Sequence, residues 1–321
     1  MNKLEILNAI APFISIGLFS SIVSRFSGAN LSILVFCALI YTGTSPVETA
    51  SIMITYLIFT KLTLHTQKYP ISFKRLRAFK GILILLPIFL ILFSLIIYPF
   101  AALIIFILTF MLEIMTQTYE QIPVHERFSI KEIALYTTIS SILMIVPFAL
   151  TKYIPYNIYY ITGGIIALVA CAFFKWIGDN RTRLQNIWDK IIIISFILSG
   201  LFGFDFTNWF KDMKRLKSTR FHKNLSLIVF PTFFITLIMS NVLFGMFSLS
   251  GLCTTFFTAL GIRFFGYYEM SGKGKFNIIA LAITVLAILI LFLTNPHPTN
   301  AAKIVDSLLQ SNFHFEGLLN M

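Results

Sequence analysis

The chain is a series of apolar runs, most of them about as long as a membrane-spanning helix, with short polar segments between them. A helix needs about 20 apolar residues to cross a hydrocarbon layer ~30 Å thick. Such runs lie at 6–26, 30–43, 46–63, 81–112, 133–151, 157–175, 190–210, 224–249, 251–269 and 277–294. The pattern predicts an all-α, polytopic transmembrane helical bundle of about ten hydrophobic segments.

Two of these runs are open to more than one interpretation. The run 30–43 is short, so it is either a half-span or one arm of a re-entrant hairpin, which requires protein to cover its backbone. The run 81–112 is long, and Tyr98-Pro99 marks either a kink in one tilted helix or a turn between two short ones. Between the second and third runs, Ser45-Pro46-Val47-Glu48 is typical of a helix start, in which we expect Glu48 to cap the helix.

The charges of the loops predict how the helices are oriented. The two most basic loops, 61–80 and 211–223, should both face the cytoplasm, where Lys and Arg collect. If 81–112 is a single crossing, the acidic loop 113–132 and the amino terminus then face outward. This topology also places the mixed loop 175–190 outside, against its basic residues.

Composition supports a membrane location. Of 321 residues, 57% are hydrophobic and 12% are charged, with a mean hydropathy of +0.86, whereas a soluble domain carries about 25% charged residues. The net charge of +12 is concentrated in loops beside apolar runs, which indicates membrane orientation and not a nucleic-acid partner. We expect residues 1–295 to form one transmembrane domain in the lipid bilayer and 296–321 a short peripheral tail.

The sequence offers little to an enzyme, a cofactor or a metal. Cys37, Cys171 and Cys253 lie in apolar runs without C-x-x-C spacing, so neither a disulfide nor a cysteine metal site is expected. H-E-x-x-H, P-loop and G-x-S-x-G motifs are absent, and the five histidines are scattered over loops and the tail. We therefore expect no catalytic activity and no cofactor.

A weak internal repeat suggests how a site is built. The segment from Ser20 to Gly28 (SSIVSRFSG) resembles the segment from Ser240 to Gly251 (SNVLFGMFSLSG), and both lead from one apolar run into the next. The topology above separates them by an odd number of crossings, so the copies, at 6–80 and 224–295, would be inverted in the membrane. Secondary transporters commonly form substrate sites from broken helices in inverted repeats, and we expect the two breaks to meet.

The amino-terminal part also resembles a known family. Residues 17–30 (GLFSSIVSRFSGAN), the apolar run to Gly43, and Ser45-Pro46-x-Glu48-x-Ala50 are similar to the amino-terminal half of the TauE/SafE sulfite-exporter family. The resemblance covers mainly residues 15–80 and, more weakly, 240–275. It implies a multi-pass secondary transporter of the bacterial cytoplasmic membrane, an exporter of sulfite, sulfonates or organic acids.

The chain departs from that family at its glycine-rich motif. The family's G-x-G-G-G is represented only by Phe26-Ser-Gly28-Ala-Asn30, and its second copy only by Ser248-Leu-Ser250-Gly251. The identity of the substrate therefore does not follow from the resemblance.

A small anion suits such breaks, because free backbone amides and the positive end of a helix dipole point into them. The candidate substrate-binding residues lie at the two breaks, with an arginine beside each as counter-charge: Ser24, Arg25, Ser27, Gly28, Asn30, Ser248, Ser250, Gly251 and Arg263. For both arginines the alternative is snorkelling to the headgroups.

Two further alternatives stay open. Asp205, near Gly200 and Gly203, is a candidate for proton coupling, or else lies at the interface beside Trp209 and Lys211. The protein as a whole is either a transporter or a lipid-handling or scaffolding subunit of an envelope assembly machine, since basic cytoplasmic loops also suit anionic lipid.

Overall fold

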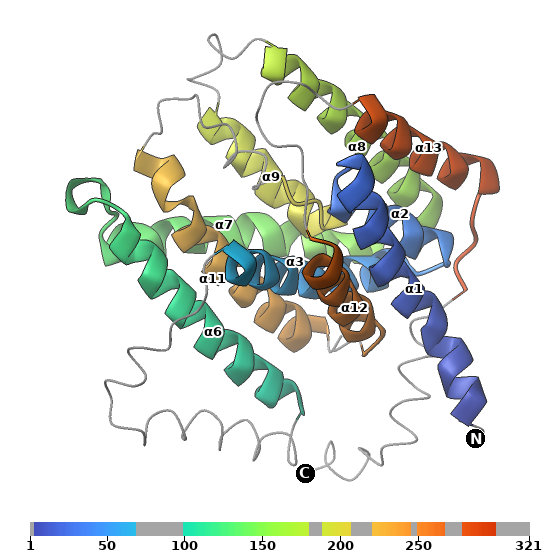
Figure 1. Cartoon of the computed structure of the whole chain (residues 1–321), viewed down its shortest axis with the longest axis horizontal. Coiled ribbons are helices and arrows are strands. Elements are labelled where there is room, and N and C mark those ends of the chain that lie inside the picture. Colours follow the sequence, from blue (N-terminus) through green and yellow to red (C-terminus); the bar gives the residue numbers. More distant parts are fainter. Residues whose placement is uncertain are drawn as a thin grey trace.

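The computed structural model describes residues 3–68, 99–179, 188–206, 220–244, 249–266 and 278–299, and within these ranges every regular element is a helix. In chain order these are α1 (Lys3–Ser27), α2 (Leu31–Tyr41), α3 (Pro46–Lys68), α6 (Pro99–Gln121), α7 (Ile130–Leu150), α8 (Tyr156–Asp179), α9 (Trp188–Phe202), α11 (Arg220–Phe244), α12 (Leu249–Phe265) and α13 (Ile278–Thr294). Short 3₁₀ turns occupy Val124–Glu126 and Thr151–Tyr153. The predicted all-α, polytopic bundle is confirmed (Figure 1).

Helix length and burial separate central from peripheral elements. In the described ranges, α1, α3, α6, α7, α8 and α11 are long and apolar enough to cross a membrane, whereas α2, α9, α12 and α13 are shorter apolar helices. The spans within α3 and α11 are 78% and 67% buried, against 28% for α6 and α7. Because lipid replaces water around such a protein, exposed apolar helices form its outer surface, and α3 and α11 form its centre.

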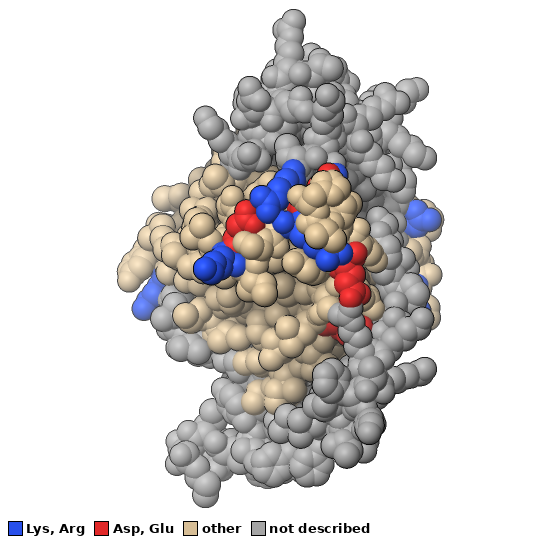
Figure 2. Space-filling model, turned by 90° about the vertical axis from the view of Figure 1, so that its left-hand side faces the viewer, with Lys and Arg blue, Asp and Glu red and all other residues tan. Residues whose placement is uncertain are grey.

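Polar contacts at one end of the bundle define what we call the A face. There, the segment between α6 and α7 meets the start of α11. Arg220 donates from Nη2 to Glu132 Oε2 at 2.9 Å, and Lys223 pairs with Glu126. Figure 2 shows the alternating basic and acidic side chains on this side of the molecule.

The opposite end, which we call the B face, contains the turn between α7 and α8. The 21 residues of α7 make it about 31 Å long, so this turn lies a membrane thickness away from the A face. Tyr156 donates from its hydroxyl to Ile40 O at 2.9 Å, and Tyr160 to Asn295 Oδ1 at 2.6 Å. The ends of α2 and α13 therefore lie on the B face.

These contacts fix the directions of the two central helices. α3 begins shortly after the end of α2, on the B face, and runs to Lys68 on the A face. α11 begins at Arg220 on the A face and runs toward the B face. The two helices pack against each other and run in opposite directions.

The predicted topology needs two corrections. α6 begins at Pro99 and its 23 residues are long enough for a crossing, so the crossing that leads into the acidic loop begins at Pro99 and not at residue 81; residues 69–98 lie outside the described ranges. The sequence analysis also predicts that the acidic loop 113–132 faces away from the basic loop 211–223, but Glu126 and Glu132 of the first pair with Lys223 and Arg220 beside the second, so the described ends share the A face. The expectation that both basic loops lie on one side still fits, since α3 ends and α11 begins there.

α1 and α12 pack against each other through small residues. At Gly17, an added Cβ would come within 2.5 Å of Thr254 O, and at Gly261 within 1.8 Å of Ser21 Oγ. Small residues at such positions let two transmembrane backbones approach closely.

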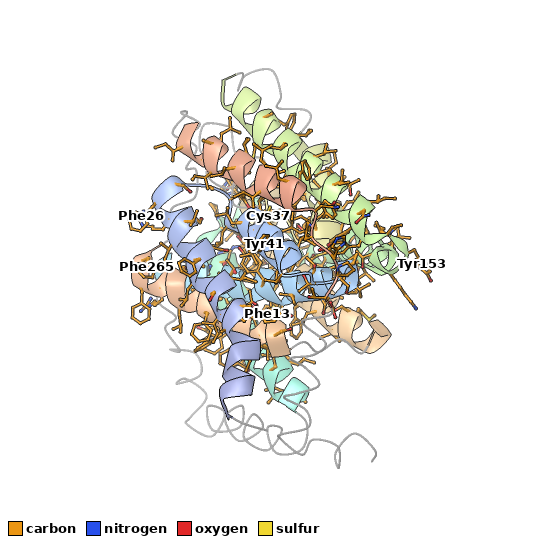
Figure 3. The ribbon with its side chains drawn as sticks, turned by 90° about the vertical axis from the view of Figure 1, so that its right-hand side faces the viewer. Phe13, Phe26, Cys37, Tyr41, Tyr153 and Phe265 are labelled. Atoms are coloured by element: carbon orange, nitrogen blue, oxygen red, sulfur yellow. The ribbon has the colours of Figure 1, made fainter. Side chains whose placement is uncertain are left out.

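Residue numbers rise together along this interface, so α1 and α12 run in parallel. The contacts pass from Gly17 with Thr254, through Ser21 with Gly261, to Arg25, whose Nε donates to Phe265 O at 2.9 Å. In Figure 3, Phe26 and Phe265 project at the same edge of the molecule.

We expect cysteines that replace Glu132 and Arg220 to be joined by a short bis-maleimide reagent in membranes, because the native side chains meet at 2.9 Å. The measurement is a shift in electrophoretic mobility after proteolysis between the two sites, in a background without the native cysteines. As a control, a cysteine at Tyr153 on the B face should not be joined to one at Arg220. Cross-linking of that control pair instead would contradict the two faces.

Replacing Gly17 by leucine should destabilise the protein by about 1–3 kcal/mol, since its Cβ would strike backbone atoms of α12. The matched control is Ser15→Leu, on the exposed side of the same helix. Thermal unfolding in detergent measures both. Equal melting temperatures for the two variants would show that α1 and α12 are not in close contact.

Candidate functional site

The first break in the bundle separates α1 from α2. Gly28 takes φ +74°, a conformation that favours glycine, and its amide donates to Ser24 O at 2.8 Å. The Ser24 hydroxyl donates to Ala29 O at 2.8 Å, and the Ala29 amide donates to Ser27 Oγ at 3.1 Å. Asn30 then caps α2, its Oδ1 accepting from the Ile33 amide. The break is closed by its own polar side chains, as a buried chain interruption requires.

A second break, after α9, has the same construction. Gly203 takes φ +69°, and its amide donates to Ser199 O at 3.0 Å. The Ser199 hydroxyl donates to Phe204 O at 2.7 Å, which reproduces the contact of Ser24 with Ala29 O. Tyr159 donates to Leu201 O at 2.7 Å, so the end of α9 reaches close to the B-face start of α8.

The two breaks are copies of one pattern at a constant separation of 175 residues. The pattern is Ser-x3-Ser-x3-Gly-x-Asn/Asp, read as Ser20, Ser24, Gly28, Asn30 and again as Ser195, Ser199, Gly203, Asp205. The same separation pairs α3 with α11, which run in opposite directions. The repeat is therefore inverted, and its second copy is α9–α11, whereas the sequence analysis expects an inverted repeat whose second copy is 224–295.

The two breaks meet inside the bundle. Asn30 donates from Nδ2 to Asp205 O at 3.3 Å, and the Asp205 amide donates to Ser32 Oγ at 3.0 Å. The Ser32 hydroxyl in turn donates to Asn30 Oδ1. Asn30, Ser32 and Asp205 are 1%, 2% and 6% exposed, so this network joins the two halves of the repeat out of contact with lipid and water.

A lysine from the centre of the bundle completes the site. Lys61 of α3 places Nζ 2.6 Å from Asp205 Oδ2, and the two side chains are 3% and 8% exposed. Lys61 had been counted with the basic loop 61–80, but α3 continues to Lys68, so Lys61 lies within the span. Asp205 is buried and paired, so it does not take the interfacial position that was the alternative to a role in proton coupling.

The Lys61–Asp205 ion pair is stable because separating the two charges would leave each of them buried without a partner. A charge buried without its partner is unfavourable by several kcal/mol, and more so when lipid surrounds the protein. Lys61, Asp205, Asn30 and Ser32 therefore offer an ammonium, a carboxylate, an amide and a hydroxyl at one point. Such a group can bind a small ion only by exchanging a partner that it already holds.

The structure divides the other predicted site residues into two groups. Ser24, Ser27, Gly28 and Asn30 lie together at the first break, each buried. Ser250 and Gly251 are buried in the first turn of α12, near the B face, whereas Ser248 lies outside the described ranges. Arg25, beside the first break, contacts Phe265 at the end of α12, which is four turns away from the first turn of that helix. The first break therefore does not meet the start of α12, although the sequence analysis expects the two to meet.

The two arginines lie on the outside of the bundle. Arg25 is exposed and donates to Phe265 O, a carbonyl at the end of α12 that has no partner within its helix. Arg263, in the last turn of α12, is exposed as well. In this conformation neither side chain points to the place where Asn30 meets Asp205.

An open groove of about 400 Å³ follows the α1–α2 hairpin on the B side. Pro12, Ile16, Leu34, Tyr41 and Leu291 are among its lining residues, and it is mainly apolar. Figure 3 shows Phe13, Cys37 and Tyr41 in this region. Of the residues in the two repeated patterns, only Ser20 lines the groove.

The sequence analysis does not single out Lys61, and it takes 240–251 as the second break, whereas the structure joins the first break to the segment that ends at Asp205. The signal for the second break was present, because Ser195, Ser199, Gly203 and Asp205 repeat the spacing of the first copy. Lys61 has no such signal, since a lysine at the end of an apolar run usually marks a loop.

Metal-ligating groups are sparse in the part of the chain that the structure describes, where no cluster of three or more His, Cys, Asp or Glu side chains occurs. No family model, curated protein or solved structure matches this chain. The class that the fold defines is a multi-pass helical membrane protein with an inverted repeat.

We expect Lys61→Gln to destabilise the protein by about 3–5 kcal/mol, because it leaves the buried Asp205 carboxylate without its ammonium. The double variant Lys61→Gln with Asp205→Asn should recover most of that loss. Lys223→Gln, which breaks a partly exposed pair, is the control and should cost at most about 1 kcal/mol. Chemical unfolding in detergent measures all three. A Lys61 variant as stable as the Lys223 variant would refute the buried pair.

Proposed function

We propose that this protein is a secondary transporter that moves a small anion across the bacterial cytoplasmic membrane, with its transport site where the two breaks meet. The observation that carries the proposal is the buried network of Asn30, Ser32, Asp205 and Lys61, which joins two inverted copies of one broken-helix pattern. Transporters built from inverted repeats bind their substrates at such interruptions.

Three features favour an anion as the substrate. Lys61 supplies a positive charge, which a small anion can use as its counter-ion. The first break lies at the start of α2, where the helix dipole adds partial positive charge. The hydroxyls of Ser24 and Ser27 and the amide of Asn30 can supply hydrogen-bond donors once their present partners are exchanged. Sulfite, a sulfonate or a small organic acid would satisfy this chemistry, in accordance with the family resemblance.

In this proposal Lys61, and not Arg25 or Arg263, provides the counter-charge. Lys61 is buried at the meeting of the breaks, whereas Arg25 binds the end of α12 from outside. The site is closed to both faces in this conformation, since its polar groups are almost fully buried. Transport therefore requires the two halves of the repeat to move relative to each other.

A lipid-handling role is the second candidate, and one observation favours it. The apolar groove between α1, α2 and α13 is open, and its volume of about 400 Å³ can accept part of an acyl chain. A scrambling assay with fluorescent phospholipid in the same vesicles tests this role separately.

We expect purified protein in proteoliposomes to exchange radiolabelled anions from a panel of sulfite, sulfonates and short carboxylates. Asn30→Ala should reduce the initial rate about 10- to 100-fold, the effect of losing a hydrogen bond to a charged group worth about 1.5–3 kcal/mol. Arg25→Gln, in the last turn of α1, is the control and should keep most of the rate because Arg25 is exposed. Absence of flux for every anion in the panel would overturn the proposal. A wild-type rate in Asn30→Ala would show that the transport site does not include Asn30.

A further inference from the structure

The ion pair at the centre of the site differs from the pairs on the A face. Lys223–Glu126 and Arg220–Glu132 are partly exposed, so water solvates their charges when they separate. The side chains of Lys61 and Asp205 are 3% and 8% exposed, and each neutralises the other within the span of the membrane. Neither charge can leave its partner unless another charge takes its place.

We infer that this pair couples transport to protons, with one proton bound by Asp205 for each monovalent anion bound by Lys61. The inference rests on the proposed function, and it adds the coupling ion and the stoichiometry. An anion that becomes the partner of the Lys61 ammonium displaces the Asp205 carboxylate. Two negative charges would then share one buried positive charge, which is unfavourable unless the carboxylate takes up a proton.

The charges balance in both states. In the empty state Lys61 and Asp205 neutralise each other. In the loaded state the proton, taken from water on the side of entry, occupies an Asp205 oxygen, and the anion neutralises Lys61, which stays protonated. Release on the other side returns the proton and the anion to water, and the original pair forms again. Each cycle therefore moves no net charge for a monovalent anion. An inward proton gradient then favours uptake, and export, the direction that the family resemblance implies, requires an outward gradient of the anion that exceeds it.

The helices around the pair carry other ionisable groups, and most of these lie at helix ends or contact other residues. His65, one turn beyond Lys61 on α3, packs edge-on against Phe230 with ring centroids 6.0 Å apart. Glu48 accepts from the Ser45 amide at the far end of α3. The remaining groups lie at the ends of α1, α3, α9, α11 and α12 or are thiols and phenols: Lys3, Glu5, Arg25, Lys68, Asp189, Lys190, Arg220, His222, Lys223, Arg263, Cys37, Cys253, Tyr41, Tyr56, Tyr159 and Tyr160. His65 is the nearest competitor for the role of proton carrier, and the test includes it.

The test uses full-length protein in proteoliposomes, with the anion that exchanges best and with the voltage clamped by potassium and valinomycin. For wild-type protein, an imposed pH gradient should accumulate the anion on the alkaline side, about tenfold for each pH unit, as one proton per anion requires. A pH-sensitive dye should record one proton entering with each anion. Accumulation that follows the imposed voltage, or a proton count of zero, would overturn the inference while leaving anion transport intact.

The variants separate coupling from structure. Any exchange of labelled for unlabelled anion that Asp205→Asn retains should occur without accumulation, so that the ratio across the membrane falls to one. Lys61→Gln should lose exchange. His65→Gln should keep both the tenfold accumulation and the proton count, and loss of either would assign the proton to His65.

Two further variants cover failures of folding. Asp205→Glu keeps the carboxylate and should keep coupling at any pH where it is stable. The double variant Lys61→Gln with Asp205→Asn is neutral, and pH-driven accumulation by it would show that the pair is only structural. Absence of exchange in wild-type protein would instead reject the proposed function.

Discussion

The structure depends on the need to keep two opposite charges together in a low-dielectric interior. Lys61 comes from the central helix of the first half, and Asp205 from the interruption in the second half. The buried charge of either residue alone would be strongly unfavourable. The pair therefore keeps α3 close to the end of α9, so that the ammonium and the carboxylate stay within hydrogen-bond distance. The Asn30 and Ser32 contacts then fix the α1–α2 hairpin to the same point.

The polar groups of the two breaks show how a chain can be interrupted inside a membrane protein. Each break uses a glycine with positive φ to end its helix and a serine one turn earlier to bond the next carbonyl. Most backbone polar groups of the two breaks therefore have hydrogen-bond partners within the protein. The same glycine and serine pattern occurs twice, in opposite orientations, and it forms both sides of the candidate site.

Much of the fold was predictable because apolar length and helix-start residues are local properties of the sequence. Most of the runs correspond to helices, and Ser45 with Glu48 forms the expected cap, in which the Ser45 amide donates to Glu48 Oε2 at 2.8 Å. The first half of the site was also predicted, because Gly28 and Asn30 interrupt an apolar run. The topology was less accurate, since loop charge does not reveal that Pro99 begins a new crossing or that Glu132 pairs with Arg220. The pairing of Lys61 with Asp205 is a tertiary contact between distant segments, and nothing local to either residue indicates it.

The close contact of α1 with α12 has a mechanical consequence. At Gly17 and Gly261 the two helices touch with almost no side chain between them, and Arg25 holds the end of α12. On the other side of the centre, Gly200 of α9 lies similarly close to Met144 O of α7. Helices joined in this way move as rigid bodies, so a movement of the first hairpin carries α12 with it and a movement of α9 carries α7. The hinge of the molecule must then lie between these two bodies, along the line where α3 meets α11.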